Sequence, residues 1–183
     1  MKIISVNIGA PKTLRWKNKK ITTGIFKKPA STPIVLGLKD VKGDNVIDRR
    51  YHGGINKAVY AYGFNHYNYW QALYPDLEFN YGMFGENLTI DFLDEKQIHI
   101  GDIFKLGTAK IEVAGPREPC YKLGIRFNDV KVVKQFWDDT KCGVYFKVLQ
   151  VGEVSVGDKF INITKHKENP SIADVYNGAK NQN

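Results

Sequence analysis

A proline-flanked cysteine is the residue of this chain best placed to do chemistry. Cys120 lies in the segment GPREPCYKLG, directly after Pro119 and between Arg117 and Lys122. Proline restricts the backbone and has no N–H for a sheet, so the segment is expected to form a turn after a strand. Neighbouring cations stabilise a thiolate, the form of cysteine that attacks electrophiles and binds soft metals. We predict that Cys120 is a nucleophile or a metal ligand; the structural alternative is a buried thiol that fills space.

Paired glycines mark a second candidate, in the segment GDNVIDRRYHGGINKAVYAY at residues 43–62. Gly53 and Gly54 can adopt positive φ angles and let the backbone approach a ligand closely. His52 precedes the pair and Lys57 follows it. We predict that these two side chains and the glycine amides cradle an anion such as a phosphate. A glycine turn leading into a strand is the structural alternative.

The segment FGENLT, residues 84–89, places several hydrogen-bonding side chains at the start of a predicted strand. Glu86 and Asn87 are adjacent, and the hydroxyl of Thr89 follows. Together they offer donors and acceptors for the edge of a nitrogen heterocycle. The same residue types also cap turns, which is the structural alternative.

Several common cofactor and metal motifs are absent from the sequence. It contains no Cys-x-x-Cys, no His-x-x-x-His, no phosphate-binding P-loop and no dinucleotide fingerprint. The four histidines show no metal-ligand spacing. The second cysteine, Cys142, leads into an alternating strand and is predicted to be a packing residue. With Cys120 as a lone soft ligand, any metal is expected to arrive already held by another group.

Hydrophobic periodicity predicts a mostly β (α+β) fold, a small β-barrel with inserted helices. Short β-branched or aromatic segments with period-two alternation predict strands at 2–8, 19–28, 32–38, 87–90, 97–107, 109–115, 143–152 and 154–163. Helical spacing predicts helices at 63–76 and 127–140, the second with Asn128 as its N-cap. The C-terminal segment NPSIADVYNGAKNQN can begin a third helix. No linker divides the chain, so residues 1–183 are predicted to form one domain.

The composition argues against secreted disulfide-rich proteins, membrane proteins and specific nucleic-acid-binding proteins. The chain of 183 residues has a formal net charge of +8 and two cysteines, too few for a disulfide framework. No apolar run approaches the roughly 20 residues that span a bilayer, and the N-terminal apolar run is short for a signal peptide. A cytoplasmic protein without a membrane partner is expected. Arginine is sparse and the lysines are scattered, so we predict no specific nucleic-acid partner. The charge is either a solvated lysine surface or a field that attracts an anionic ligand.

The chain resembles the MOSC domain, the C-terminal domain of molybdenum cofactor sulfurases, and within that family the YiiM-like branch. The resemblance is carried, in order, by GDNVIDRRYHGGINKAVYAY, HYNYW, FGENLT, GDIFKLGTAKIEVAGPREPCYKLG and GVYFKV. It covers about residues 37–163 and leaves 164–183 as a short C-terminal tail. It implies a β-barrel with added helices, in agreement with the strand pattern.

The resemblance also implies a cofactor and its binding residues. MOSC proteins bind the molybdenum cofactor, a phosphate-bearing pterin whose dithiolene sulfurs hold the metal, and the family cysteine that ligates molybdenum corresponds to Cys120. The pterin phosphate is then expected at His52, Lys57 and Arg117 with the amides of Gly53 and Gly54. The pterin edge is expected at Glu86, Asn87 and Thr89, with Lys122 beside the thiolate. Lys57 stands where relatives often have arginine, which replaces a bidentate fork by a point charge.

YiiM-like members reduce N-hydroxylated substrates such as hydroxylaminopurines, and the resemblance therefore implies a molybdenum-cofactor-dependent oxidoreductase. Its partners are expected to be a small N-hydroxylated substrate and a separate electron-donor reductase, because no flavin or nicotinamide motif is visible. The alternative is a non-catalytic cofactor carrier, or a sulfur-relay module that uses a Cys120 persulfide. Nothing resembles the pyridoxal-phosphate domain of the larger sulfurases, so sulfurase activity is not expected.

Overall fold

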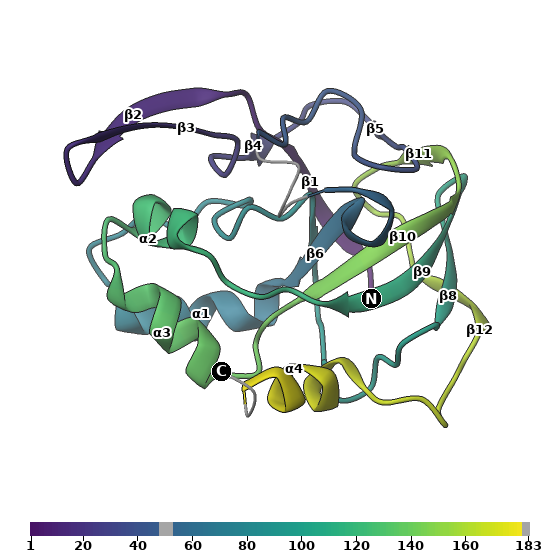
Figure 1. The fold of residues 1–183 in the computed structure, drawn as a ribbon. Coiled ribbons are helices and arrows are strands. Elements are labelled where there is room, and N and C mark those ends of the chain that lie inside the picture. Colours follow the sequence, from purple (N-terminus) through teal and green to yellow (C-terminus); the bar gives the residue numbers. More distant parts are fainter. Residues whose placement is uncertain (48–52, 181–183) are drawn as a thin grey trace.

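A curled eight-stranded sheet, shaped like half a barrel, forms the centre of the molecule (Figure 1). The structure is a computed structural model that describes residues 1–47 and 53–180. The strand order across the sheet is β12-β8-β9-β10-β6-β7-β1-β4. These strands are β1 (Ile3–Ile8), β4 (Lys28–Pro29), β6 (Val59–Gly63), β7 (Leu88–Ile90), β8 (Ile103–Leu106), β9 (Ala109–Pro116), β10 (Val144–Gln150) and β12 (Ile161–Thr164). The predicted class, mostly β with inserted helices, is confirmed.

Alternating burial explains why the two longest strands of the sheet pair. In β9, Ile111 and Val113 point into the core, and in β10 Phe146 and Val148 do the same. The antiparallel register places Phe146 opposite Val113 and Val148 opposite Ile111, so apolar side chains meet on one face. The last residues of β9 lie outside this alternation and lead toward Cys120.

The parallel pair β6–β7 requires a long connection, and this connection supplies the first helix. After β6 come the 3₁₀ turn η2 (Phe64–His66) and α1 (Tyr67–Leu73). Within the predicted helix at 63–76, only these central residues are α-helical, and the helix ends before Pro75 as expected. Trp70 of α1 is fully buried and stacks on Phe136 with ring centroids 5.7 Å apart.

Within the predicted helix at 127–140, the helical residues are those of α3 (Lys131–Asp138), and a second helix that was not predicted, α2 (Tyr121–Phe127), comes directly before it. The assignment of Asn128 as an N-cap is wrong, because this residue terminates α2. It adopts the left-handed conformation with φ 52°, and its N–H donates to the carbonyls of Gly124 and Ile125. Asparagine tolerates this conformation, which makes it a frequent residue at helix C-termini. In Figure 1, α1, α2 and α3 gather beside one end of the sheet.

Two predicted strands, 97–107 and 154–163, are shorter than expected because each contains a Gly-Asp corner. Gly101 and Gly157 have φ angles of 86° and 96°. The following carboxylates accept backbone N–H groups, Asp102 from His99 at 3.0 Å and Asp158 from Ser155 at 2.8 Å. Because of these turns, β8 and β12 begin only after the Gly-Asp corner, at Ile103 and Ile161. Glycine is needed at both positions because the φ angles are positive.

Two small sheets complete the strand set. β5 (Ile34–Leu36) pairs with β11 (Gly152–Val154) beside the main sheet. β2 (Lys12–Trp16) and β3 (Lys19–Thr23) form a hairpin that projects from the body in Figure 1. The sequence pattern missed β2 and extended β3 to residue 28, because most side chains of this hairpin are exposed and lack a buried face.

The C-terminal segment is not a free tail, since it forms helix α4 (Ile172–Lys180) and packs on the core. Ser171 and Asp174 form a reciprocal cap, in which the Ser171 hydroxyl accepts the Asp174 N–H at 3.1 Å. Tyr176 is buried, donates to the Phe136 carbonyl at 2.8 Å, and stacks on Trp137. No helix among the described residues is long and apolar enough to cross a membrane.

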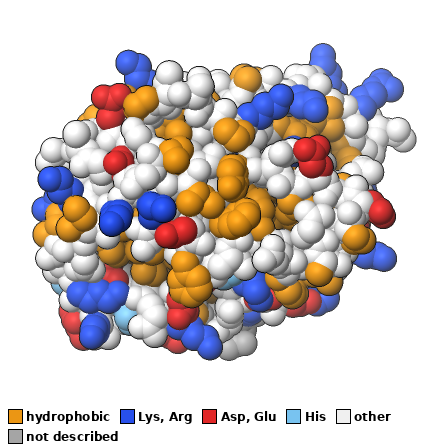
Figure 2. All heavy atoms as spheres, turned by 180° about the vertical axis from the view of Figure 1, so that it is seen from behind, with side chains coloured by type: hydrophobic (Ala, Val, Ile, Leu, Met, Phe, Trp, Pro, Cys, Tyr) orange, Lys and Arg blue, Asp and Glu red, His pale blue; other side chains and the backbone are white. Residues whose placement is uncertain are grey.

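The basic side chains show no single stripe on the face seen in Figure 2. Lysine and arginine side chains are scattered over it between hydrophobic and uncharged ones. On this face the surface agrees with the expected solvated lysines.

Candidate functional site

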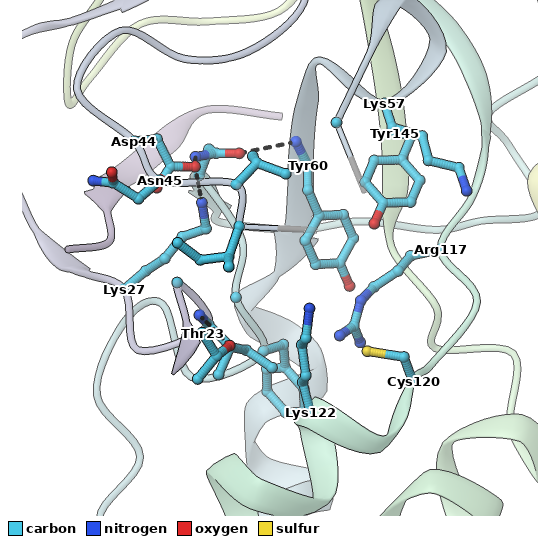
Figure 3. A pocket seen from close by; sticks show the side chains of 18 of the residues that line it. Thr23, Lys27, Asp44, Asn45, Lys57, Tyr60, Arg117, Cys120, Lys122 and Tyr145 are labelled. Carbon is cyan, nitrogen blue, oxygen red and sulfur yellow. Dashed lines mark hydrogen bonds and ion pairs between the residues drawn. The ribbon is translucent and has the colours of Figure 1, made fainter. Parts of the chain in front are cut away.

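A cavity of about 100 Å³ lies where several segments that are distant in the sequence meet. They are the end of β3 with the loop that follows, residues 44–47, the described residues from Gly53 into β6, the loop before β7, the turn between β9 and α2, and Tyr145 of β10 (Figure 3). Its polar and charged lining residues are Thr23, Lys27, Asp44, Asn45, Lys57, Tyr60, Asn87, Arg117, Cys120, Lys122 and Tyr145.

The cavity brings together residues from all three motifs singled out in the sequence. Six of the ten predicted site residues line it: Gly53, Lys57, Asn87, Arg117, Cys120 and Lys122. Gly54 has the predicted positive φ of 86°, but its N–H donates to the Lys39 carbonyl at 3.0 Å and is not available to a ligand. His52 lies outside the described residues.

Glu86 and Thr89 are placed differently from the sequence-based expectation. The Glu86 carboxylate is fully buried and accepts from the hydroxyl of Tyr67, from Thr89 at 2.9 Å, and from the Gly82 and Phe84 N–H groups at 2.9 and 3.0 Å. Neither Glu86 nor Thr89 is among the lining residues of the cavity. Both side chains are bonded within the core, so this geometry gives no support to their expected contact with a pterin edge.

Arg117 is a buried cation whose surroundings suit the binding of an anion. It is 5% exposed, and its guanidinium lies over the rings of Tyr60 and Phe136, 5.2 and 5.1 Å from their centroids. Its Nη1 atom is buried without a hydrogen-bond partner. Burial opposes the charge, but Tyr60, Tyr145 and Cys120 outweigh it and raise the pKa of Arg117. The guanidinium is therefore permanently charged and has an unused donor, a combination that an anionic ligand would satisfy.

Cys120 lies directly beside this guanidinium in Figure 3. It is partly exposed to solvent and precedes the first turn of α2, where its carbonyl accepts the Leu123 N–H at 2.9 Å. Cys142 is fully buried, and burial, reinforced by Glu95, raises the pKa of its thiol well above the ordinary value. The prediction that Cys142 is a packing residue is confirmed.

Among the described residues of the cavity wall, positive charge exceeds negative charge. In that part of the chain four cations (Lys27, Lys57, Arg117 and Lys122) line the cavity against one carboxylate, Asp44. Lys122 is 8% exposed, and Figure 3 shows its ammonium pointing into the cavity. Lys57 is exposed, and its ammonium lies 5.9 Å from the ring centroid of Tyr145.

The carboxylate of Asp44 is already engaged. Asp44 pairs with the Lys27 ammonium and accepts from Asn87 at 2.9 Å and from the Gly9 N–H at 2.8 Å. Burial lowers the pKa of Lys27, although Asp44 opposes the shift. With Lys27 balanced by Asp44, the buried guanidinium of Arg117 and the ammonium of Lys122 still add positive charge to the wall. They make the cavity complementary to an anion.

Comparison with known proteins identifies the family. Residues 48–160, more than half of the chain, match the MOSC domain. The chain belongs to the MOSC domain family. YflK of Bacillus subtilis (strain 168), a relative of this MOSC protein, is 36% identical over 183 aligned residues, which cover 98% of this chain and 82% of YflK. YiiM of Escherichia coli (strain K12) is 39% identical over 136 residues, which cover 73% of this chain and 60% of that protein.

A third MOSC relative is a larger protein described as a reductase, from Gibberella moniliformis (strain M3125 / FGSC 7600). It is 35% identical over 143 residues, and this chain spans 25% of its length. Among solved structures, YiiM from Geobacillus stearothermophilus superposes with a TM-score of 0.81 at 32% identity, covering 99% of this chain and 84% of that one. The MOSC fold and the YiiM-like relationship are thus both shown. The family is associated with molybdenum-cofactor function.

The MOSC match begins at residue 48, and no sequence motif singled out the cavity residues that precede it. Thr23, Lys27, Asp44 and Asn45 line one wall, and Tyr145 lines another. Asp44 lies within the GDN triplet that opens the glycine-rich segment, so an acidic residue beside glycine was an available signal. Lys27 gave no signal, because one lysine among 22 cannot be recognised as buried without the fold.

The donor set of this MOSC cavity fits a phosphate-bearing pterin that carries its own metal ligands. Arg117 has a buried, unpaired donor, and Lys122 and Lys57 add charge for a phosphate. Cys120 offers one soft sulfur ligand at the same wall. Within the described ranges, no three His, Cys, Asp or Glu side chains are grouped to hold a metal ion unaided. A metal at this site therefore needs ligands from a second group, which the dithiolene of the pterin would provide.

Proposed function

We propose that this MOSC protein binds the molybdenum cofactor in the Cys120 cavity and reduces N-hydroxylated compounds of the hydroxylaminopurine kind. The observation that carries the proposal is the juxtaposition of a partly exposed cysteine with a buried arginine that has an unused donor. The similarity to YiiM proteins and to a fungal reductase supports it. The overall reaction converts R–NHOH, two electrons and two protons into R–NH₂ and water.

Each wall of the cavity has a separate task in this proposal. Arg117, Lys122 and Lys57 hold the phosphate by charge-assisted hydrogen bonds, and Asn87 fixes the opposite wall through Asp44. Cys120 provides the thiolate ligand. When bound, the cofactor supplies two-electron redox chemistry at its metal. The Tyr60 hydroxyl is bonded to the Cys142 carbonyl at 2.9 Å, so it shapes the wall and is not free to donate to a ligand.

The rival function is a cofactor carrier or a persulfide relay, and one experiment separates the two. The protein is purified anaerobically from a host that makes the cofactor, and its molybdenum-to-protein ratio is measured. It is then incubated with a hydroxylaminopurine and chemically reduced viologen. Molybdenum near one per chain with amine production supports the reductase. Molybdenum without amine production supports a carrier, and absence of molybdenum overturns cofactor binding.

Replacing Arg117 is expected to weaken cofactor retention. A charge-assisted hydrogen bond is worth roughly 1.5–3 kcal/mol, so Arg117→Ala should lower affinity by about tenfold or more. Arg117→Met preserves more of the buried volume and should give the same loss if charge is what matters. Lys57→Ala should have a smaller effect, because the Lys57 side chain is exposed and screened by water.

The readout is the molybdenum that remains bound after dilution and gel filtration. Lys134→Ala is the matched control, since this lysine side chain is 80% exposed on α3 and does not line the cavity. Full retention by both Arg117 variants would show that the phosphate lies elsewhere.

A further inference from the structure

The β2–β3 hairpin forms a ribbon with little support from the rest of the molecule. Its strands pair in register from Lys12 opposite Thr23 to Trp16 opposite Lys19. The two-residue turn, Lys17 and Asn18, has positive φ angles of 46° and 62°, as tight hairpin turns require. Figure 1 shows the ribbon extending away from the sheet, past α2. A two-stranded hairpin alone is marginally stable in water, so this exposed arrangement needs an explanation.

Uncompensated positive charge is concentrated on this hairpin. It has five exposed cations and no acidic residue between positions 12 and 23: Lys12, Arg15, Lys17, Lys19 and Lys20. Among the described residues, none of the five takes part in an ion pair. Arg15 lies directly opposite Lys20, and like charges in this relation destabilise a strand pair. Contacts within the chain therefore do not stabilise the positive charges of the hairpin. This indicates that the hairpin binds an acidic surface of another molecule.

The hairpin is joined directly to the wall of the cavity. Thr23, the last residue of β3, lines the cavity, and so do Gly24, Ile25 and Lys27 immediately after it. The first strand is held at the same place, where the Lys12 ammonium lies 4.3 Å from the ring centroid of Phe26. A protein bound along the ribbon would therefore lie at the edge of the Cys120 cavity.

We propose that the β2–β3 hairpin docks an acidic electron-transfer protein beside the cavity. This inference rests on the proposed function, whose reaction consumes two electrons that must come from another redox carrier, such as a flavin or an iron–sulfur cluster. Charge-steered, salt-sensitive contacts of small area are typical of electron-transfer complexes. The ribbon offers one arginine among five cations, which favours an acidic protein surface over a nucleic acid read by arginine forks.

The test compares two triple variants with the same change in charge. The hairpin variant carries Lys17→Glu, Lys19→Glu and Lys20→Glu. The control carries Lys105→Glu, Lys159→Glu and Lys167→Glu, three exposed lysines outside the cavity lining. Lys105 lies on β8 and the other two are close to β12 in the sequence, and Figure 1 shows these two strands at the opposite end of the molecule from the hairpin. Lys20→Glu places a carboxylate opposite Arg15, and this cross-strand pair of opposite charges is expected to stabilise the hairpin of the variant.

Cofactor-loaded proteins are assayed with a hydroxylaminopurine and with one of two reductants. With reduced viologen, both variants should match the parent protein. With reduced flavodoxin, a small acidic flavoprotein, the hairpin variant should lose about tenfold or more of its rate at low salt, and the control less than about twofold. Anisotropy of labelled flavodoxin measures binding without turnover and should show the same order.

The outcomes separate the two proposals. No turnover with viologen would contradict the proposed function, and the anisotropy would still decide whether the hairpin binds an acidic protein. Turnover with viologen, together with equal flavodoxin rates and affinities for both variants, would overturn docking at the hairpin. The proposed function would not be affected by this result. A tight RNA or DNA complex that disappears in the hairpin variant would also overturn it, in favour of a nucleic-acid surface.

Discussion

Replacing Cys120 by serine is expected to abolish reduction of N-hydroxylated substrates while the protein still unfolds cooperatively. Serine is nearly isosteric, so the turn before α2 should be preserved. A hydroxyl is a harder and far less acidic ligand than a thiol, and it cannot reproduce a soft thiolate on molybdenum. The measurements are amine production with reduced viologen and a urea unfolding curve.

Cys142 provides the internal control, because it is a buried cysteine that does not line the cavity. The same substitution there shows what the loss of a thiol costs in stability alone. Cys142 is 0% exposed and holds no position in the cavity lining. Cys142→Ser buries a hydroxyl, which is expected to cost about 1–3 kcal/mol of stability, and activity should persist. Alkylation should follow the same order, with Cys120 reacting faster in cofactor-free protein and protected once cofactor is bound. Retained turnover in Cys120→Ser would make the metal-ligand assignment wrong.

Much of the fold could be predicted because alternation in the sequence reports directly on burial. β9 and β10 alternate between buried and half-buried residues, and the sequence pattern located both. Boundaries failed where a single residue decides the path of the backbone. Asn128 looks like a helix start, but its left-handed conformation ends α2, and that choice depends on how α2 and α3 pack. The β2–β3 hairpin has no buried face, so hydrophobic pattern could not define it.

The candidate site was predictable in part, for a similar reason. The motifs that contain Cys120, Arg117 and Lys57 could be recognised because their residue types indicate a reactive thiol and an anion-binding site. The fold brings these three residues to one cavity. Lys27 and Asp44 depend on a contact between segments 17 residues apart, which no local pattern encodes. Glu86 is a different case, because its contact with a ligand stays a prediction while its contacts within the protein were not expected. A carboxylate beside an amide suggests a ligand contact, yet the local turn directs it into the core, where four donors surround it.

Glu86→Ala is expected to destabilise the protein severely. The substitution removes the acceptor for two hydroxyls and two backbone N–H groups, all of them buried. A buried donor that is left without its acceptor typically costs about 1–3 kcal/mol, so several such donors together remove a large part of the roughly 5–15 kcal/mol by which a domain is stable. Urea unfolding with linear extrapolation measures the loss. Glu78→Ala is the matched control, since Glu78 is exposed and should change stability by less than about 0.5 kcal/mol.

Glu86→Gln distinguishes a core acceptor from a cofactor contact. Burial raises the pKa of Glu86, while the hydrogen bonds from Tyr67, Thr89 and Gly82 oppose that rise. The amide oxygen of glutamine can replace the carboxylate oxygen that accepts these three donors, whereas its NH₂ group meets the Phe84 N–H and loses one bond. Glu86→Gln should therefore be much more stable than Glu86→Ala and should retain molybdenum. If Glu86→Gln folds normally but loses the cofactor, the carboxylate contacts the pterin edge, as the sequence predicted. A Glu86→Ala variant as stable as the parent would contradict the buried four-donor arrangement itself.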